Sequence, residues 1–291
     1  MKKSLKKIGK GMFLIFTFKL LIVGFSFIIQ SCQQDEIENN ESIQAKENFL
    51  KTALNGIDKL NDISIKSTPK DFNNKSSVYS RTVEDIAYIS VYTLPDKTYS
   101  GDESILENPT LTQLAYADDL EVGISYPDGR ESDNISDDQG LLATYEISEK
   151  EAKESLQPTL AEAKNYLRSK GLTDIDIQNL LTADEYGPAM SESDLIPAVM
   201  QLIAEEENQS LALKSVDFSL FGTSAHASRI GGCAGDALGI SAITAVVSQG
   251  LHTSAGKALL KKAIRKVATR ALGWVGAAIF TYEFGDCMGW W

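Results

Sequence analysis

The chain has 291 residues, of which 43% are hydrophobic and 23% charged, so its composition excludes a wholly disordered protein and allows one or two domains with a sizeable core. Its formal net charge of −12 argues against nucleic acid as a partner, because the phosphate backbone repels an acidic surface. The charge is unevenly distributed: residues 1–31 carry +6, residues 32–228 carry −22 and residues 229–291 carry +4. The sequence therefore has three parts of alternating sign.

Residues 1–31 have the pattern of an export signal. Lysines between Lys2 and Lys10 precede an apolar run, whose uninterrupted part, 20–29, is ten residues long and too short to cross a bilayer as a helix. The sequence Ile29-Gln30-Ser31-Cys32 follows and resembles the lipobox of bacterial lipoproteins, in which the cysteine takes the lipid. The acidic residues after it resemble the tether of Gram-negative lipoproteins, including those exported to the cell surface.

This resemblance implies that residues 1–31 are removed and that Cys32 is acylated. It also implies that the mature chain is anchored by its lipid in the outer membrane, with exposure at the cell surface left open. The alternative is an uncleaved signal anchor that spans the membrane over 12–29. Lys19 disfavours this alternative, because a lysine in the middle of a span is costly.

Two cysteines remain, Cys233 and Cys287. In an oxidising compartment they predict one disulfide, which would close a loop of 54 residues and add about 4 kcal/mol of stability by loop entropy. The alternative is a pair of buried thiols. No further cysteine exists, and His226 and His252 are the only histidines, so the sequence predicts neither a zinc-type metal site nor a cofactor.

Residues 32–80 are predicted to form an acidic tether, one helix and a linker. The helical pattern covers 43–61, and the linker covers 62–80 with its proline and paired asparagines. The apolar residues that the helical spacing places on one face are Ile43, Leu50, Ala53, Leu54, Ile57 and Leu60.

Residues 81–215 are predicted to form an acidic domain that begins with short strands. Two stretches have a period of two, which is typical of short strands. Over 86–92, Ile86, Tyr88 and Tyr92 interleave with Ala87, Ile89 and Val91, and over 120–126 apolar residues alternate with polar or glycine neighbours. The second strand runs into a turn and a polar, acidic segment, 128–140, which we expect to be a loop.

Helices are predicted in the rest of this domain. Pro158 suits the first position of one helix and Gly171 its end. Thr173 and Asp176 form a capping-box pattern that opens a short helix through Leu181. Ser193 can cap a third helix, which ends in three glutamates at 205–207, where a helix prefers cations.

Residues 229–291 differ in composition from the rest of the chain, and three helices are predicted there, over 233–249, 254–271 and 272–284. None of their apolar runs is long enough to predict a membrane span. The middle helix, opened by Ser254, is a basic amphipathic helix, which suits an anionic membrane or an acidic protein surface. The basic residues of this helix are Lys257, Lys261, Lys262, Arg265, Lys266 and Arg270.

Glycines and tryptophans concentrate in the same segment. Small residues four positions apart share a helix face and predict close helix packing, since glycine inside a helix otherwise costs about 1 kcal/mol. Tryptophan is suited to a lipid–water interface. The glycines in question are Gly231, Gly235, Gly239, Gly273, Gly285 and Gly289, and the tryptophans are Trp274, Trp290 and Trp291.

A disulfide-closed, glycine-rich, cationic segment of this kind resembles a bacteriocin-like or glycine-zipper module, over residues 231–291. The sequence thus predicts a mainly α fold, in which an acidic helical domain with short strands precedes a small module of two or three helices. The resemblance implies a toxin-like protein that acts on a membrane or a partner through the module. The alternative is a structural or binding lipoprotein in which these helices are ordinary core. No catalytic or phosphate-binding motif is present, and we predict no enzyme.

Overall fold

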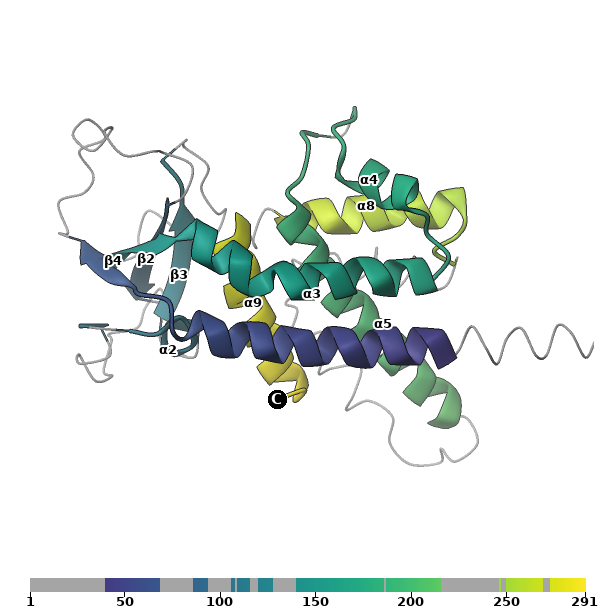
Figure 1. Ribbon diagram of the computed structural model, residues 1–291, viewed down its shortest axis with the longest axis horizontal. Coiled ribbons are helices and arrows are strands. Elements are labelled where there is room, and N and C mark those ends of the chain that lie inside the picture. Colours follow the sequence, from purple (N-terminus) through teal and green to yellow (C-terminus); the bar gives the residue numbers. More distant parts are fainter. Residues whose placement is uncertain are drawn as a thin grey trace, which may run out of the picture. The chain divides into compact units, whose positions relative to one another are not determined.

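The computed structural model describes residues 40–68, 86–93, 106–107, 109–115, 120–127, 140–185, 187–215, 246, 250–268 and 273–291. These residues are mainly helical, as the sequence predicts, and the strands form a small antiparallel sheet (Figure 1). Residues 45–291 form one compact unit, separate from 1–44. The predicted signal at 1–31 and Cys32 lie outside the described residues.

The sheet has four strands in the order β1-β4-β2-β3, and all neighbours are antiparallel. The predicted strands correspond to β2 (Ile86–Thr93) and β3 (Leu120–Ser125), while β1 (Lys66–Thr68) and β4 (Leu141–Ser148) were not predicted. In β2 every second residue is buried, which places one face of the sheet against the core. The buried residues of β2 are Ala87, Ile89 and Val91.

Residues 40–60 form the first described helix, which ends one residue before the predicted range of 43–61 does. Within the compact unit this helix packs along α3 (Glu149–Ser169), where the Thr159 hydroxyl donates to the carbonyl of Thr52 at 3.0 Å (Figure 1). The predicted apolar face is partly wrong: Leu54 is 38% exposed and Ile43 47% exposed. The sequence did not single out Phe49, which is fully buried in the core, whereas Leu54 is not.

Helix α3 begins nine residues before the predicted position. Ser148 is its N-cap and accepts from the Glu151 amide, so Pro158 lies inside the helix and not at its first position. An exposed proline inside a helix removes one backbone hydrogen bond without burying an unpaired group. Gly171 follows the helix with φ +84°, which confirms the predicted end.

The next two helices are α4 (Asp174–Leu181) and α5 (Leu195–Ser215), joined through the short 3₁₀ turn η2 (Glu192–Asp194). The predicted capping box of Thr173 and Asp176 is present in full. Ser193 is not the cap of the next helix: Ser191 caps η2, which continues directly into α5. Helix α5 also continues past 205–207, because those glutamates have cationic and hydrogen-bonding partners.

The last two helices are α8 (Ser254–Ala268) and α9 (Gly273–Met288), close to two of the three predicted positions. Thr253, not Ser254, caps α8, since its hydroxyl accepts from the Gly256 amide at 2.9 Å. The predicted helix at 233–249 lies outside the described residues except for Val246, which is helical and buried. Gly250 follows it with φ +78°, the conformation of a residue that ends a helix.

Helices α8 and α9 do not form a separate module. Helix α9 packs against α3, α5 and α2 (Leu111–Ala115), and α8 packs against α4 and α5 (Figure 1). They lie in the same compact unit as the preceding helices. Cys287 lies in the last turn of α9, but Cys233 lies outside the described residues, so their disulfide stays a prediction.

Candidate functional site

The most distinctive polar contacts lie between two parts of the compact unit. We call the described residues of 45–207 the body and the described residues of 250–291 the tail. In most of the contacts described below that join the two parts, a carboxylate of the body accepts from a donor of the tail. The opposite charges seen in the sequence therefore meet within one chain.

Three basic residues of α8 face acidic residues of the body. Lys257 pairs with Asp176 at 2.7 Å, Lys261 pairs with Asp184 at 3.0 Å, and Arg265 pairs with the other oxygen of Asp184. The cations are four residues apart and therefore form one stripe along the helix. We call this set of five residues the clamp.

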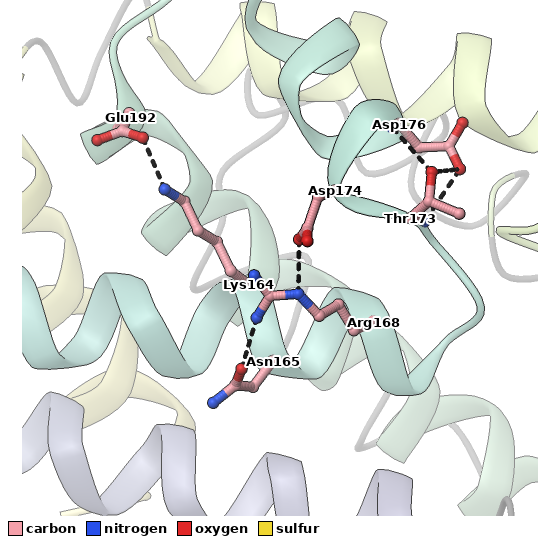
Figure 2. A network of polar contacts seen from close by, with 7 residues as sticks. All are labelled: Lys164, Asn165, Arg168, Thr173, Asp174, Asp176 and Glu192. Atoms are coloured by element: carbon pink, nitrogen blue, oxygen red, sulfur yellow. Dashed lines mark hydrogen bonds and ion pairs between the residues drawn. The ribbon is translucent and has the colours of Figure 1, made fainter.

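Local structure fixes the two acidic residues of the clamp. Asp176 is held in the first turn of α4 by the Thr173 backbone amide at 3.0 Å and its hydroxyl at 2.8 Å (Figure 2). Asp184 lies opposite Gly187, and two backbone hydrogen bonds join these residues. This turn also presents the Gly187 carbonyl, which accepts from Arg265 Nη2 at 3.3 Å.

The electrostatics of Asp176 follow from these contacts. The hydrogen bond from Lys257, together with those from Thr173, lowers the pKa of the Asp176 carboxyl to about 2. The carboxylate is therefore ionised at neutral pH, where its contact with Lys257 is charged.

The other basic residues predicted for this helix are not part of the clamp. Lys262 and Lys266 are exposed on the sector of α8 turned away from the body, and Arg270 lies outside the described residues. The apolar side of α8 is buried, as the amphipathic pattern predicts, through Leu260, Ala263 and Ile264.

The start of α9 is fixed by an acidic residue of the body. The Glu149 carboxylate accepts from the backbone amides of Trp274 at 2.7 Å and Val275 at 3.2 Å, and from the Tyr126 hydroxyl at 3.1 Å. These amides belong to the first turn of α9, where no partner exists within the helix. Glu149 thus caps a helix that begins more than a hundred residues later.

Gly273 makes this approach sterically possible. Its φ is +67°, and a Cβ at this position would overlap Tyr126 Oη and lie 2.6 Å from Glu149 Oε1. The glycine therefore allows the close approach of two side chains, those of Tyr126 and of Glu149 at the start of α3.

Trp274 is 7% exposed and packs in the core, with Lys153 Nζ 5.8 Å from the centre of its ring. This position differs from the membrane-facing one expected from its residue type. Trp290 is half-buried, and its indole N–H donates to Glu207 of α5 at 3.3 Å. Glu207 also pairs with Lys46 of the first helix, so one carboxylate joins the tail to two body helices.

The last glycines have local roles. At Gly285 a Cβ would overlap the Trp291 ring, so this glycine gives room for the chain end to fold back on α9. Gly289 has φ +71° and ends the helix, with the Trp290 amide bonded to the Gly285 carbonyl at 2.9 Å. Gly231, Gly235 and Gly239 lie outside the described residues.

Near the same end of α5, Glu206 accepts from the Tyr166 hydroxyl and from Lys170, each at 2.7 Å. Burial, and then the charge of Glu206, raise the pKa of Tyr166 well above its usual value. This tyrosine is therefore a neutral hydrogen-bond donor at neutral pH.

The described residues contain no group of three His, Cys, Asp or Glu side chains placed to hold a metal ion. No helix within the described ranges combines the length and apolar character required to cross a bilayer. Comparison of the chain with family models, with curated proteins and with solved structures finds no match.

Sequence reasoning predicted the cations but not their acceptors. Glu149 and Asp184 carry no local pattern that distinguishes them from the other acidic residues of the chain, and Glu207 was noted only as part of the acidic run 205–207. The available signal was the charge difference between the two segments, which indicates that a contact is favourable but not which residues make it.

Proposed function

We propose that this protein is a lipid-anchored structural or binding protein of the outer membrane, in which the C-terminal helices belong to the core of the folded domain. The observation that carries the proposal is the capping of α9 by Glu149 of the body. We expect a segment that acts independently of the body to supply the cap of its own helix, whereas the cap of α9 is a residue of the body.

Burial supports the same proposal. Ten residues of α9 are buried, among them Trp274, Val275 and Phe284. Each large apolar side chain stabilises the fold by about 1.5–3 kcal/mol when buried. Release of α9 would expose these residues and would leave the Glu149 carboxylate without its amide donors.

Deletion of 231–291 tests this function. We expect the truncated chain to lose its cooperative thermal unfolding, measured by circular dichroism, because α3 and α5 lose the helix they pack against. The control is the full chain with Cys233→Ser and Cys287→Ser, which removes the predicted disulfide but keeps the packing of α9. Unchanged melting of the truncated chain would show that the tail is not part of the core.

The membrane anchor is tested separately. We propose that Cys32 carries the lipid, on the basis of its place after the predicted signal. Cys32→Ser should abolish metabolic labelling of the protein by a fatty acid. Labelling that persists in this variant would mean that the lipobox interpretation is wrong, whatever the role of the tail.

A membrane-active protein is the second candidate. The absence of any acidic residue from α8, which has the sequence SAGKALLKKAIRKVA, favours it. This function predicts leakage of anionic vesicles by the full chain and unchanged melting of the body when the tail is deleted. The two candidates therefore differ in the outcome of one deletion.

A further inference from the structure

The clamp uses the cations that an amphipathic helix would present to an anionic membrane. Lys257, Lys261 and Arg265 lie on one stripe of α8, beside the buried apolar residues of the same helix. Helices of this type lie in the interface of a bilayer with their apolar side in the lipid and their cations among the phosphates. In this protein the apolar side contacts the body, and the stripe contacts Asp176 and Asp184.

We propose that the clamp is an autoinhibitory contact, in which Asp176 and Asp184 compete with an anionic lipid surface for α8. The clamped helix is inactive, and a helix that has left the body binds the lipid. This goes beyond the proposed function, because α9 stays in the core in both states and α8 alone changes its partner.

The contacts make the two states mutually exclusive. The clamp cations are 15–31% exposed and the clamp carboxylates 20–29% exposed. Lipid phosphates can therefore surround these cations only after α8 has separated from the two carboxylates. Leu260 and Ile264 must leave the body at the same time, since the apolar side and the stripe adjoin. The clamp cations and the apolar side of α8 can therefore reach a membrane only in the undocked fraction.

This exclusivity gives a quantitative expectation. The apparent affinity of a binding-competent state is reduced by its population, so a variant that raises the undocked fraction raises vesicle affinity by the same factor. Loss of the clamp carboxylates weakens docking without removing any cation or apolar residue that the membrane would contact. Vesicle binding should then rise although no residue of α8 has changed.

The chain offers a matched control for this experiment. Asp174 lies two residues before Asp176 and pairs with Arg168 at 2.7 Å, and Glu192 pairs with Lys164 at 2.6 Å (Figure 2). Both ion pairs stay within the body. Asp174→Asn with Glu192→Gln therefore removes two negative charges, as Asp176→Asn with Asp184→Asn does, but leaves the clamp intact.

Both double variants and the wild type are prepared as chains that begin at residue 32 and carry Cys32→Ser, so that no lipid anchor contributes to binding. They are sedimented with vesicles of phosphatidylcholine, with and without phosphatidylglycerol. We expect the clamp variant to bind the anionic vesicles at least about tenfold more tightly than the wild type. The control variant should stay within about twofold, and binding to neutral vesicles should be weak for all. An equal rise in both variants would overturn the proposal, because it would reflect net charge alone.

Two further measurements address stability and the class of partner. Thr182→Asp in the clamp variant returns a carboxylate near Lys261, whose Nζ lies 3.5 Å from the Thr182 hydroxyl, and should restore weak binding. If the clamp double variant loses cooperative melting, the single variant Asp176→Asn is tested in its place. A folded variant whose affinity for anionic vesicles does not rise would overturn the proposal. Binding to soluble polyphosphate without binding to vesicles would also overturn the lipid assignment.

Discussion

Helices α8 and α9 are neighbours at the end of the chain, yet the body holds them in different ways. Helix α8 contacts it through one apolar side and a stripe of cations, and its opposite sector is exposed. Helix α9 is buried around most of its circumference and is capped by Glu149. Both are rich in small and apolar residues, so composition alone does not separate an edge helix from an interior one.

The distribution of charge explains the difference. Five basic residues between Lys257 and Lys266 keep α8 at the surface, since each of them requires either water or a carboxylate. Helix α9 has no basic residue, and its two acidic ones lie in its second half. Its first half can therefore be enclosed without burying a charged side chain.

The largest effect is expected where α9 is buried most deeply. Phe284 is 1% exposed, stacks on Phe280 at 5.4 Å between ring centres and meets Trp290 edge-on at 5.7 Å. Phe284→Ala should reduce the free energy of unfolding by about 3–5 kcal/mol, because it leaves a cavity in the core. Urea denaturation measures this, with Ile175→Ala, at a 74% exposed position, as a control that should change stability by less than about 0.5 kcal/mol. A loss below about 1 kcal/mol at Phe284 would mean that α9 is not an interior helix.

The cap of α9 should come next. Glu149→Ala leaves two backbone amides and the Tyr126 hydroxyl without their acceptor and should cost about 2–3 kcal/mol in the same denaturation experiment. Glu149→Gln keeps an acceptor and should cost less. Glu151→Ala is the matched control, since this exposed glutamate lies in the same turn of α3. If Glu149→Ala and Glu151→Ala lowered the stability equally, the contribution of Glu149 would come from its charge at the start of α3 and not from capping α9.

A smaller effect that changes sign is expected at Gly285. In the wild type, Gly285→Ala forces the Trp291 ring away from α9 and should destabilise the protein by about 1–3 kcal/mol. In a Trp291→Ala background the same change should stabilise it by up to about 1 kcal/mol, because alanine is the better helix former. The four variants form a double-mutant cycle, measured by thermal melting. Additive effects would mean that the Trp291 ring does not pack on this glycine.

The smallest effect belongs to the clamp and depends on pH. The pKa of Asp176 is lowered from 3.8 to about 2 in the folded protein, so its stabilising contribution is present above 3.8 and is lost as the pH falls through 2. The melting temperature of Asp176→Asn should therefore lie below that of the wild type at neutral pH, and the two should converge near pH 2. Asp174→Asn provides the comparison. A difference between wild type and Asp176→Asn that persists at pH 2 would contradict the assignment.

Local patterns predicted local structure well. The alternation over 86–92 and the Thr173–Asp176 capping box were correct because each depends on residues a few positions apart. The sequence did not indicate β4, and the start of α3 was placed at Pro158, since a proline is more common there than inside a helix. The true cap, Ser148, has the common residue type of a cap, but so do many other residues of this serine-rich chain.

Contacts between distant residues were beyond the sequence. Gly273, Gly285 and Gly289 looked alike as small residues at regular spacing, yet one accommodates Tyr126, one a tryptophan ring and one a positive φ. Spacing along a helix specifies which residues share a face but not what that face meets. The same limit applies to Glu149, because nothing near it in the sequence indicates a helix that begins at Gly273.

The interior position of α9 has a consequence for the order of synthesis. Helices α3 and α5 are complete by Ser215, but the helix they enclose begins at Gly273. A ribosome therefore produces most of the body before it produces the helix that completes the core, and the earlier residues stay without their final packing during that time. We therefore expect the body to reach its final packing only after α9 has been synthesised.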